Sequence, residues 1–192
     1  MRTSKHSTSP VSRLKSAPGA VFLARLVVGV LAFVMAAAVT TSCLSTHFDG
    51  ITYRSKDINF TVAEKPANWR GLSVSDALIA YHDDVSHATI AVNGRCGKDG
   101  DDVPLAALTQ HLFIYFTERE IIDQKTVPLD GREALRTELV AKLDGVARGF
   151  VVYVLKKDGC VYDFLFVGEP GLAGHDDFDD YVMSFRTGLA RR

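Results

Sequence analysis

The sequence predicts an α+β fold in which an antiparallel β-sheet is flanked by helices, an α/β/α sandwich. Three observations support this prediction. The second half of the chain is divided by Asp-Gly pairs at 130–131, 144–145 and 158–159, which favour tight turns between antiparallel strands. Residues 150–155 are apolar on both sides of a strand, so both faces of the sheet must be covered. Apolar residues at helical spacing near 105–116 and 178–185 predict the covering helices.

The first half of the domain contains three expected strands. Residues 57–63 alternate polar and apolar side chains with period two, which predicts a strand with one buried face. After a break around Trp69, residues 77–82 and 87–93 favour two further strands. The polar turn at 83–86 between them predicts a hairpin.

A polar loop at 98–102 precedes an expected amphipathic helix. Pro104 suits the first turn of this helix, where its missing N–H is not needed. Apolar residues then recur at helical spacing over about three turns, at Leu105, Leu108, Leu112 and Tyr115 or Phe116. Such a helix needs a sheet face on which to bury its apolar side.

The second half of the domain is expected to be a meander that ends in a helix. A strand at 126–129 leads into the first Asp-Gly turn, and two long strands cover 150–155 and 160–167. A further strand is expected between residues 129 and 150. One of its sides carries Leu135, Thr137, Leu139, Ala141 and Leu143, and the other carries Arg136, Glu138 and Lys142. The closing helix has Asp176 and Asp177 near its start, where the dipole favours acids. It presents one apolar stripe, formed by Phe178, Tyr181, Val182 and Phe185.

The first 42 residues have the pattern of an export signal. Five basic residues and no acid precede Asp49, and an uncharged apolar run covers the 14 residues from Leu26 to Val39. That run is shorter than the roughly 20 residues needed to span a bilayer, and extending it backwards to Ala20 includes Arg25. We therefore expect residues 1–42 to be a signal peptide that is removed.

Cys43 follows the small residues Thr41 and Ser42, which resembles the lipobox of bacterial lipoproteins. This resemblance implies that Cys43 is diacylated and becomes the mature N-terminus. Thr40 departs from the lipobox, which usually carries an aliphatic residue at that position. Two alternatives therefore stay open: ordinary cleavage near 36–38 or directly after Ser42, and an uncleaved signal anchor.

The lipoprotein resemblance also implies a location. The protein would be exported to the bacterial cell envelope and attached to a membrane by its N-terminal lipid. In the enterobacterial sorting rule an Asp after the lipidated cysteine retains the protein at the inner membrane, so Leu44 favours the outer membrane. Residues 43–50 are then a tether, and residues 51–187 form one domain. The 150 residues that remain after cleavage are enough for a single core.

The charge of the mature chain excludes one class of partner. Without the five basic residues of the leader, 17 Lys and Arg face 23 Asp and Glu, a formal charge near −6. A chain this acidic lacks the basic surface that binds nucleic acid. It is also mildly repelled by anionic headgroups, so the lipid would have to hold it at the membrane.

Two cysteines remain when Cys43 is acylated. Cys96 and Cys160 each lie at the end of an apolar, strand-like run. Because an exported protein meets oxidising conditions, a disulfide between them is plausible. Two buried, inert thiols are the alternative. The pair lacks the nearby His or Cys of a zinc site.

A family resemblance starts at the first expected strand. Residues 59–62, Asn-Phe-Thr-Val, are followed by Pro66 and Trp69. This order resembles the opening of the PsbP/Mog1-like α/β/α sandwich.

The similarity continues through most of residues 51–187. It includes the hairpin sequence 129–134, the turn at 143–145 and a last helix that ends in Ser184-Phe185. The superfamily contains photosystem II extrinsic subunits, a Ran-binding nuclear factor and many bacterial lipoproteins. Its members share binding and assembly work rather than one chemistry, so no set of functional residues carries over to this sequence.

Motifs for catalysis or metal binding are lacking. No HExxH, GxSxG, P-loop or CxxC pattern occurs. His82 and His87 flank an acidic turn that could in principle gather a cation, but a solvated hairpin tip is the better interpretation. The acidic groups at 99–102 and 176–180 likewise fit a solvated loop and a helix start. We expect a non-enzyme without cofactor or metal.

Two functional hypotheses remain. The first is a lipid-anchored envelope protein that binds or assembles with another envelope protein. The second is a carrier of an apolar small molecule or lipid held under the helix at 104–117. The carrier requires that aromatic residues line a cavity, whereas they most simply form the core: Phe113, Tyr115, Phe116, Tyr153, Tyr162, Phe164 and Phe166. A hydrolase working through Cys160 or a metal-bound water is the least supported class.

Overall fold

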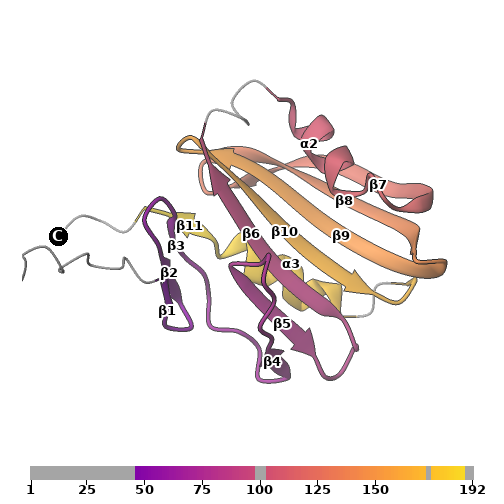
Figure 1. Ribbon diagram of the computed structural model, residues 1–192, viewed down its shortest axis with the longest axis horizontal. Helices are drawn as coiled ribbons and strands as arrows, with labels where there is room; N and C mark the ends of the chain where they lie inside the picture. The colour runs from indigo at the N-terminus through magenta and orange to yellow at the C-terminus, as the bar shows by residue number, and fades with distance from the viewer. Residues whose placement is uncertain (1–45, 98–102, 172–173, 189–192) are drawn as a thin grey trace, which may run out of the picture. The chain divides into compact units, whose positions relative to one another are not determined.

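A computed structural model describes residues 46–97, 103–171 and 174–188, and its strands form two antiparallel sheets (Figure 1). The large sheet has the strand order β4-β5-β6-β10-β9-β8-β7. Its strands are β4 (Trp69–Gly71), β5 (Ile79–Asp83), β6 (Thr89–Cys96), β7 (Thr117–Leu129), β8 (Arg132–Leu143), β9 (Val146–Lys157) and β10 (Cys160–Gly168). The small sheet has the order β1-β2-β3-β11, formed by β1 (His47–Phe48), β2 (Thr52–Arg54), β3 (Asn59–Thr61) and β11 (Arg186–Thr187).

The Asp-Gly pairs form the turns of the meander, as predicted. Each pair lies between two residues that are partners in the ladder: Leu129 with Arg132, Leu143 with Val146, and Lys157 with Cys160. Both central residues of each turn have positive φ, from 49° to 53° at the aspartates and from 73° to 81° at the glycines. These are the values of two-residue type I′ turns, which match the twist of the flanking strands.

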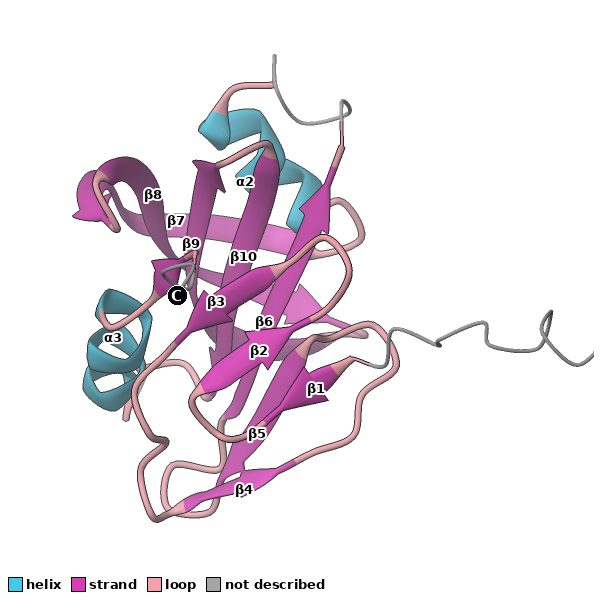
Figure 2. Ribbon diagram, turned by 90° about the vertical axis from the view of Figure 1, so that its left-hand side faces the viewer, coloured by secondary structure: helices cyan, strands magenta, loops and turns pink. Residues whose placement is uncertain are grey.

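Helices cover both faces of the large sheet. Helix α2 (Leu105–Leu112) packs over β8 and β9, with Leu108 and Phe113 against Phe150 and Val152. Helix α3 (His175–Met183) packs on the opposite face. The small sheet lies on the α3 side and contacts the core through Phe60 and the ring of Tyr162 (Figure 2). The predicted fold class, α+β with an antiparallel sheet flanked by helices, is confirmed.

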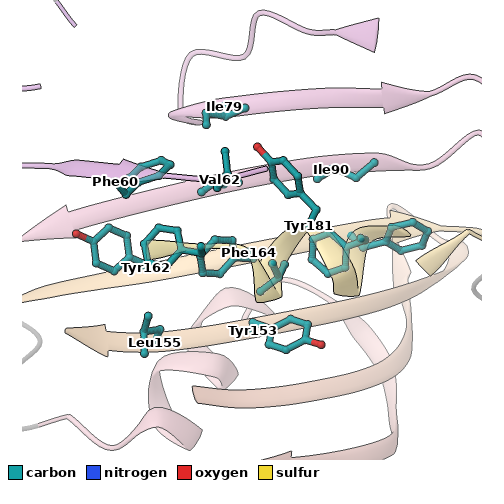
Figure 3. Packing of buried hydrophobic residues seen from close by; sticks show 14 of the residues in the cluster. Phe60, Val62, Ile79, Ile90, Tyr153, Leu155, Tyr162, Phe164 and Tyr181 are labelled. Carbon is teal, nitrogen blue, oxygen red and sulfur yellow. The ribbon is translucent and has the colours of Figure 1, made fainter. Parts of the chain in front are cut away.

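The main core lies between the large sheet, α3 and the small sheet (Figure 3). The predicted closing stripe is confirmed, because its four members are buried: Phe178, Tyr181, Val182 and Phe185. Phe185 lies just beyond the helix, and its ring centroid is 4.9 Å from those of Tyr162 and Phe164. Aromatic pairs in this range add to the energy of burial itself.

Three predicted boundaries were wrong. Helix α2 ends at Leu112 rather than near residue 116, and Tyr115 is 91% exposed instead of buried. Strand β7 begins at Thr117, nine residues before the predicted start at 126. It is the edge strand and is exposed on both sides, so it lacks the alternation that marks a half-buried strand. His47 and Phe48, expected in a tether, pair with β2.

One predicted surface residue also differs. Arg136 was expected on the polar side of β8, yet it is only 6% exposed because α3 covers that side of the strand. Within the described parts of the chain, no helix has the length and apolar character needed to cross a membrane.

Candidate functional site

A cavity of about 270 Å³ lies between α2 and the strands β7 and β8. It is lined by Thr109, Gln110 and Phe113 of α2 and its end, by Arg119, Ile121 and Gln124 of β7, and by Thr137 and Leu139 of β8. This is the face of the sheet under the helix at 104–117, where the carrier hypothesis expected a ligand. The walls come from three elements, so the cavity depends on how they pack together.

Two polar side chains of the cavity wall donate hydrogen bonds to other groups of the protein. The hydroxyl of Thr109 donates to the carbonyl of Leu105 at 2.9 Å, a bond back along the helix. The amide Nε2 of Gln124 donates to Thr137 Oγ1 at 2.9 Å. Phe113, Ile121 and Leu139 supply the apolar surface. The interior can therefore receive an apolar group without leaving these polar atoms unpaired.

Arg119 is the one charged residue among those that line the cavity. Its guanidinium makes a long hydrogen bond, 3.4 Å, from NH1 to the carbonyl oxygen of Phe113. A guanidinium has five N–H donors in a planar fork, so this single bond uses a small part of its capacity. Arg119 is exposed at the rim of the cavity.

The chain segment 114–122, which passes the cavity, carries four exposed apolar side chains, here called the β7 patch. It consists of Ile114, Tyr115, Ile121 and Ile122, which are 57%, 91%, 56% and 55% exposed. Leu143 and Val146 of the adjacent β8–β9 turn are also exposed, at the same end of the sheet. Large apolar side chains that gather on a surface indicate an interaction site more strongly than scattered ones do.

Two irregularities interrupt β7 around its isoleucines. The ladder between β7 and β8 shifts register between Thr117 and Glu120, and again between Ile121 and Asp123. Glu118, in the first irregularity, has a positive φ of 48°. In the second, two steps along β7 oppose one step along β8, so an extra residue is accommodated there. Such bulges twist an edge strand and interrupt its free hydrogen-bonding groups.

The β7 patch and the small sheet lie at opposite ends of the long strands (Figure 1). Thr187 of β11 bonds to Asp130 and Asp158, in the β7–β8 and β9–β10 turns. The start of β7 pairs instead near the β8–β9 turn, where Thr117 is the partner of Lys142. Strand β9 joins the two ends with 12 residues, a length of roughly 40 Å.

A wider groove of about 910 Å³ lies near the start of α2. Its wall combines Leu105 with the ends of β7, β8 and β9, including Arg132, Glu133 and Lys156. Lys156 donates to the carbonyl of Val103 at 3.0 Å. The groove has charges of both signs, and it offers neither a nucleophile with an adjacent base nor a consistent charge for a ligand.

Cys96 and Cys160 are joined by a disulfide, in agreement with the predicted bridge rather than with two buried thiols. The two residues are direct partners in the ladder between β6 and β10. A disulfide-bonded Cys160 has no free thiolate, so it cannot serve as the nucleophile of the hydrolase hypothesis. Cys43 lies outside the described residues, as do residues 1–42 and the acidic loop at 99–102.

The acidic hairpin between β5 and β6 is structural. Asp83 is buried and accepts hydrogen bonds from Asn68 Nδ2 at 2.7 Å and from the backbone N–H of Val85 at 2.9 Å. Burial opposes its ionisation, but the bonds from Ser86, Val85 and Asn68 outweigh burial and lower the pKa of Asp83. Its carboxylate is therefore already satisfied. No group of three potential metal ligands occurs among the described residues.

The sequence analysis missed a buried polar cluster on the α3 side of the sheet. Arg136 donates from Nε to the hydroxyl of Tyr153 at 3.1 Å, and from NH2 to Asp179 of α3 at 3.0 Å. Tyr153 donates to the other oxygen of Asp179 at 2.9 Å. Burial and the charge of Asp179 raise the pKa of Tyr153, so the phenol stays protonated. The cluster holds α3 on β8 and β9. The sequence gives no local signal for it, because Arg136 alternates with apolar residues in the same way as the exposed side of a strand.

Comparisons with known proteins identify the fold but no close relative. No family model matches the sequence, and no curated protein matches it. Among solved structures, this chain is similar to cyanobacterial PsbP (CyanoP) from Synechocystis sp. PCC 6803, with a TM-score of 0.50, 15% identity, and coverage of 78% of this chain and 99% of that one. It is also similar to LpqN of Mycobacterium tuberculosis, described as involved in cell envelope biogenesis, with a TM-score of 0.50, 17% identity, and coverage of 70% and 87%.

A third similar structure comes from Bacteroides thetaiotaomicron VPI-5482, with a TM-score of 0.52 and 10% identity. The match covers 76% of this chain and 51% of that one, so this chain spans about half the length of the Bacteroides protein. At these identities the comparisons show the fold alone. The protein has a PsbP/Mog1-like fold, as its sequence motifs predicted.

Proposed function

We propose that this protein is a lipid-anchored module of the bacterial cell envelope that docks a protein partner and performs no catalysis. The observation that carries the proposal is the β7 patch. Four large apolar side chains within residues 114–122 are each more than half exposed in the described part of the chain. Burying such side chains in a partner gains free energy in proportion to the apolar area removed from water.

The composition of the patch favours a protein interface. Tyr115 is amphipathic, and tyrosine is enriched among the residues that dominate binding energy. The cavity beside the patch provides a recess of the kind into which such interfaces insert anchor side chains. Arg119, at the rim of that cavity, is a second residue type enriched at interfaces.

The position of the patch favours a protein over a lipid surface. If Cys43 carries the lipid, the tether enters the domain at β1, in the small sheet. The β7 patch lies at the other end of the long strands, remote from that entry point. The mature chain is also acidic, near −6, and a net negative charge opposes contact with anionic headgroups.

Location in the envelope is supported by the leader and by one structural neighbour. Residues 1–42 have the composition of an export signal, followed by the lipobox-like Cys43. The similar LpqN is described as involved in cell envelope biogenesis. That likeness is one of fold, so it supports the setting rather than a particular partner.

The second candidate function is a carrier of a small apolar molecule. The cavity under α2 favours it, because it lies where such a ligand was expected. Its volume of about 270 Å³ is below the roughly 300–1,000 Å³ typical of small-molecule sites. It is too small for a lipid with long acyl chains, so the carrier would have to bind a compact molecule.

Site-specific photo-crosslinking in cells tests the docking function. A photoreactive phenylalanine analogue replaces Tyr115 in the full-length, lipidated protein, and replaces Val85 as the control. Val85 is 75% exposed but lies on the β5–β6 hairpin, away from the patch. We expect one reproducible envelope protein to be linked at position 115 and not at position 85. Equal labelling at both positions, or none at position 115, would reject docking through this surface.

Native mass spectrometry of the same preparation separates the two candidates. A docking module should show the mass of the lipidated chain, alone or with its partner. A stoichiometric small molecule that leaves on denaturation would support the carrier instead.

A further inference from the structure

We infer that the cavity under α2 seats one apolar side chain of the protein partner, and that Arg119 binds a carboxylate next to that side chain. The partner would therefore present a short peptide segment in which an aromatic or aliphatic residue is flanked by Asp or Glu. This inference rests on the proposed docking function and names the chemistry of the partner.

The size and lining of the cavity suit one apolar side chain of a partner. Its 270 Å³ falls short of a typical small-molecule site but suits the end of one large side chain. The apolar part of the wall comes from Phe113, Ile121 and Leu139, while Thr109 Oγ1 and Gln124 Nε2 already donate hydrogen bonds to other atoms of the protein. An apolar insert removes its surface from water against these three side chains without leaving the bonded polar atoms unpaired.

The charge at the rim of the cavity suits a carboxylate of the partner. Arg119 has a single long hydrogen bond to the Phe113 carbonyl, and no carboxylate is among the lining residues. Two acids of β7 are engaged with lysines: Glu118 Oε1 is 2.7 Å from Lys142 Nζ, and Asp123 Oδ2 is 3.1 Å from Lys125 Nζ. Glu120 is exposed and is not among the residues that line the cavity. The planar fork of a guanidinium matches a carboxylate with two parallel hydrogen bonds.

The irregular shape of β7 disfavours binding of the partner as an added strand. Strand addition requires a regular row of free backbone groups along an edge. The two register shifts, in Thr117–Glu120 and Ile121–Asp123, interrupt that row beside the cavity. The partner is thus held by side chains, with the β7 patch around the anchor, and not by an extension of the large sheet.

A peptide selection tests the inference. A random heptapeptide library displayed on phage is selected against the purified mature protein, with its disulfide intact. We expect enriched peptides to pair an aromatic or aliphatic residue with Asp or Glu within one or two positions. Failure to enrich any peptide, or enrichment of peptides without an acid, would overturn the inference.

A double-mutant cycle then identifies the ion pair. Replacing the acid of the best peptide by its amide should weaken binding to the wild-type protein about tenfold or more. The same replacement should have little effect on binding to Arg119→Gln, because the guanidinium is gone. Arg70→Gln is the matched control, since Arg70 is an exposed arginine of β4 at the opposite edge of the large sheet. An equal loss in Arg119→Gln and in the wild type would overturn the assignment of Arg119.

Two further measurements locate the anchor and identify the class of ligand. Gln110→Phe adds bulk at an exposed position that lines the cavity and should abolish peptide binding without affecting the fold. Undiminished binding would place the anchor elsewhere.

Free phenylacetate combines an aromatic ring with a carboxylate, as the expected peptide does, and it should bind far more weakly than the peptide. Equal affinity would assign the cavity to small carboxylates instead. Cross-links from the photoreactive residue at position 115 should be lost in Arg119→Gln and Gln110→Phe. If they persist in both variants, the proposed docking function stands and only the role given to the cavity is wrong.

Discussion

The backbone N–H of Thr187 donates to the carboxylate of Asp130 at 2.7 Å, although 57 residues separate the two in the chain. The hydroxyl of Thr187 donates to the same oxygen at 2.9 Å, and Lys157 Nζ lies 2.6 Å from it. One aspartate of a hairpin turn thus holds the last strand of the small sheet against the end of the large sheet. Burial opposes its ionisation, but the bonds from Lys157 and Thr187 outweigh burial and lower the pKa of Asp130.

This lowered pKa predicts a pH dependence of stability. A carboxyl group whose pKa is lower in the folded state stabilises the fold above its unfolded pKa of about 3.9. That contribution is lost as the pH falls through the folded pKa. Asp130→Asn keeps a residue suited to the positive φ of the turn but removes the charge. We expect it to lower the free energy of unfolding by about 1–3 kcal/mol at pH 7, measured by urea denaturation.

The difference between wild type and Asp130→Asn should shrink as the pH falls below the unfolded pKa of about 3.9 and through the lower folded pKa, because Asp130 then takes up a proton in both states. Asp144→Asn is the matched control. Asp144 occupies the same position of an equivalent turn, with φ of 50°, but it is exposed. It should unfold like the wild type at every pH. A difference between wild type and Asp130→Asn that does not depend on pH would exclude the charge as the cause.

Phe185→Ala should strongly destabilise the domain. Phe185 is fully buried, and its ring lies within 5.1 Å of the rings of Phe60, Tyr162 and Phe164. Truncating a buried Phe typically costs about 3–5 kcal/mol, measured here by chemical denaturation. Met183→Ala, at an exposed end of α3, should change stability little. Full stability of Phe185→Ala combined with loss of partner binding would show that this stripe is a docking surface.

The Cys96–Cys160 disulfide should be formed in the exported protein. Alkylation without reductant is then expected to leave both cysteines unlabelled. The bridge closes a separation of 64 residues, for which the chain-entropy account gives a stabilisation of about 4 kcal/mol. Replacing both cysteines by Ala should lower the melting temperature accordingly. Rapid labelling of either thiol in the native, unreduced protein would contradict the bridge.

The cluster of Arg136, Tyr153 and Asp179 should contribute to stability through Asp179. Asp179→Asn removes the carboxylate that accepts from both other members, and charge-assisted hydrogen bonds contribute about 1.5–3 kcal/mol each. We expect a loss in this range by urea denaturation. Asp180→Asn, the exposed neighbour on α3, is the control and should be nearly silent. Equal stability of the two variants would mean that Arg136 finds sufficient partners in Glu138 and Asp123.

Cys43→Ala should block lipidation and leave an unprocessed precursor. If the lipobox interpretation is right, intact-mass analysis of the wild type will show a chain that begins at Cys43 and carries acyl groups. An unmodified N-terminus at Val39 or at Cys43 would replace the lipoprotein with a soluble, secreted domain.

Features that depend on a local pattern could be predicted from the sequence. The Asp-Gly turns, the doubly covered strand β9 and the stripe of α3 were all predicted, because each is encoded by neighbouring residues with a fixed period or a required φ. The sequence made a Cys96–Cys160 bridge plausible beside the alternative of two buried thiols, and the pairing of β6 with β10 then places the two cysteines opposite each other.

Which apolar and charged side chains are exposed depends on the order of the strands and the packing of the helices. Isoleucine is typical of buried strands, yet Ile121 and Ile122 are exposed because β7 is the edge strand of the sheet. The strand is also bulged at this point. Arginine is typical of protein surfaces, yet Arg136 is buried because α3 crosses its face of β8. The cavity is the space among α2, β7 and β8. Such features depend on strand order and on the packing of distant segments, which no local period encodes.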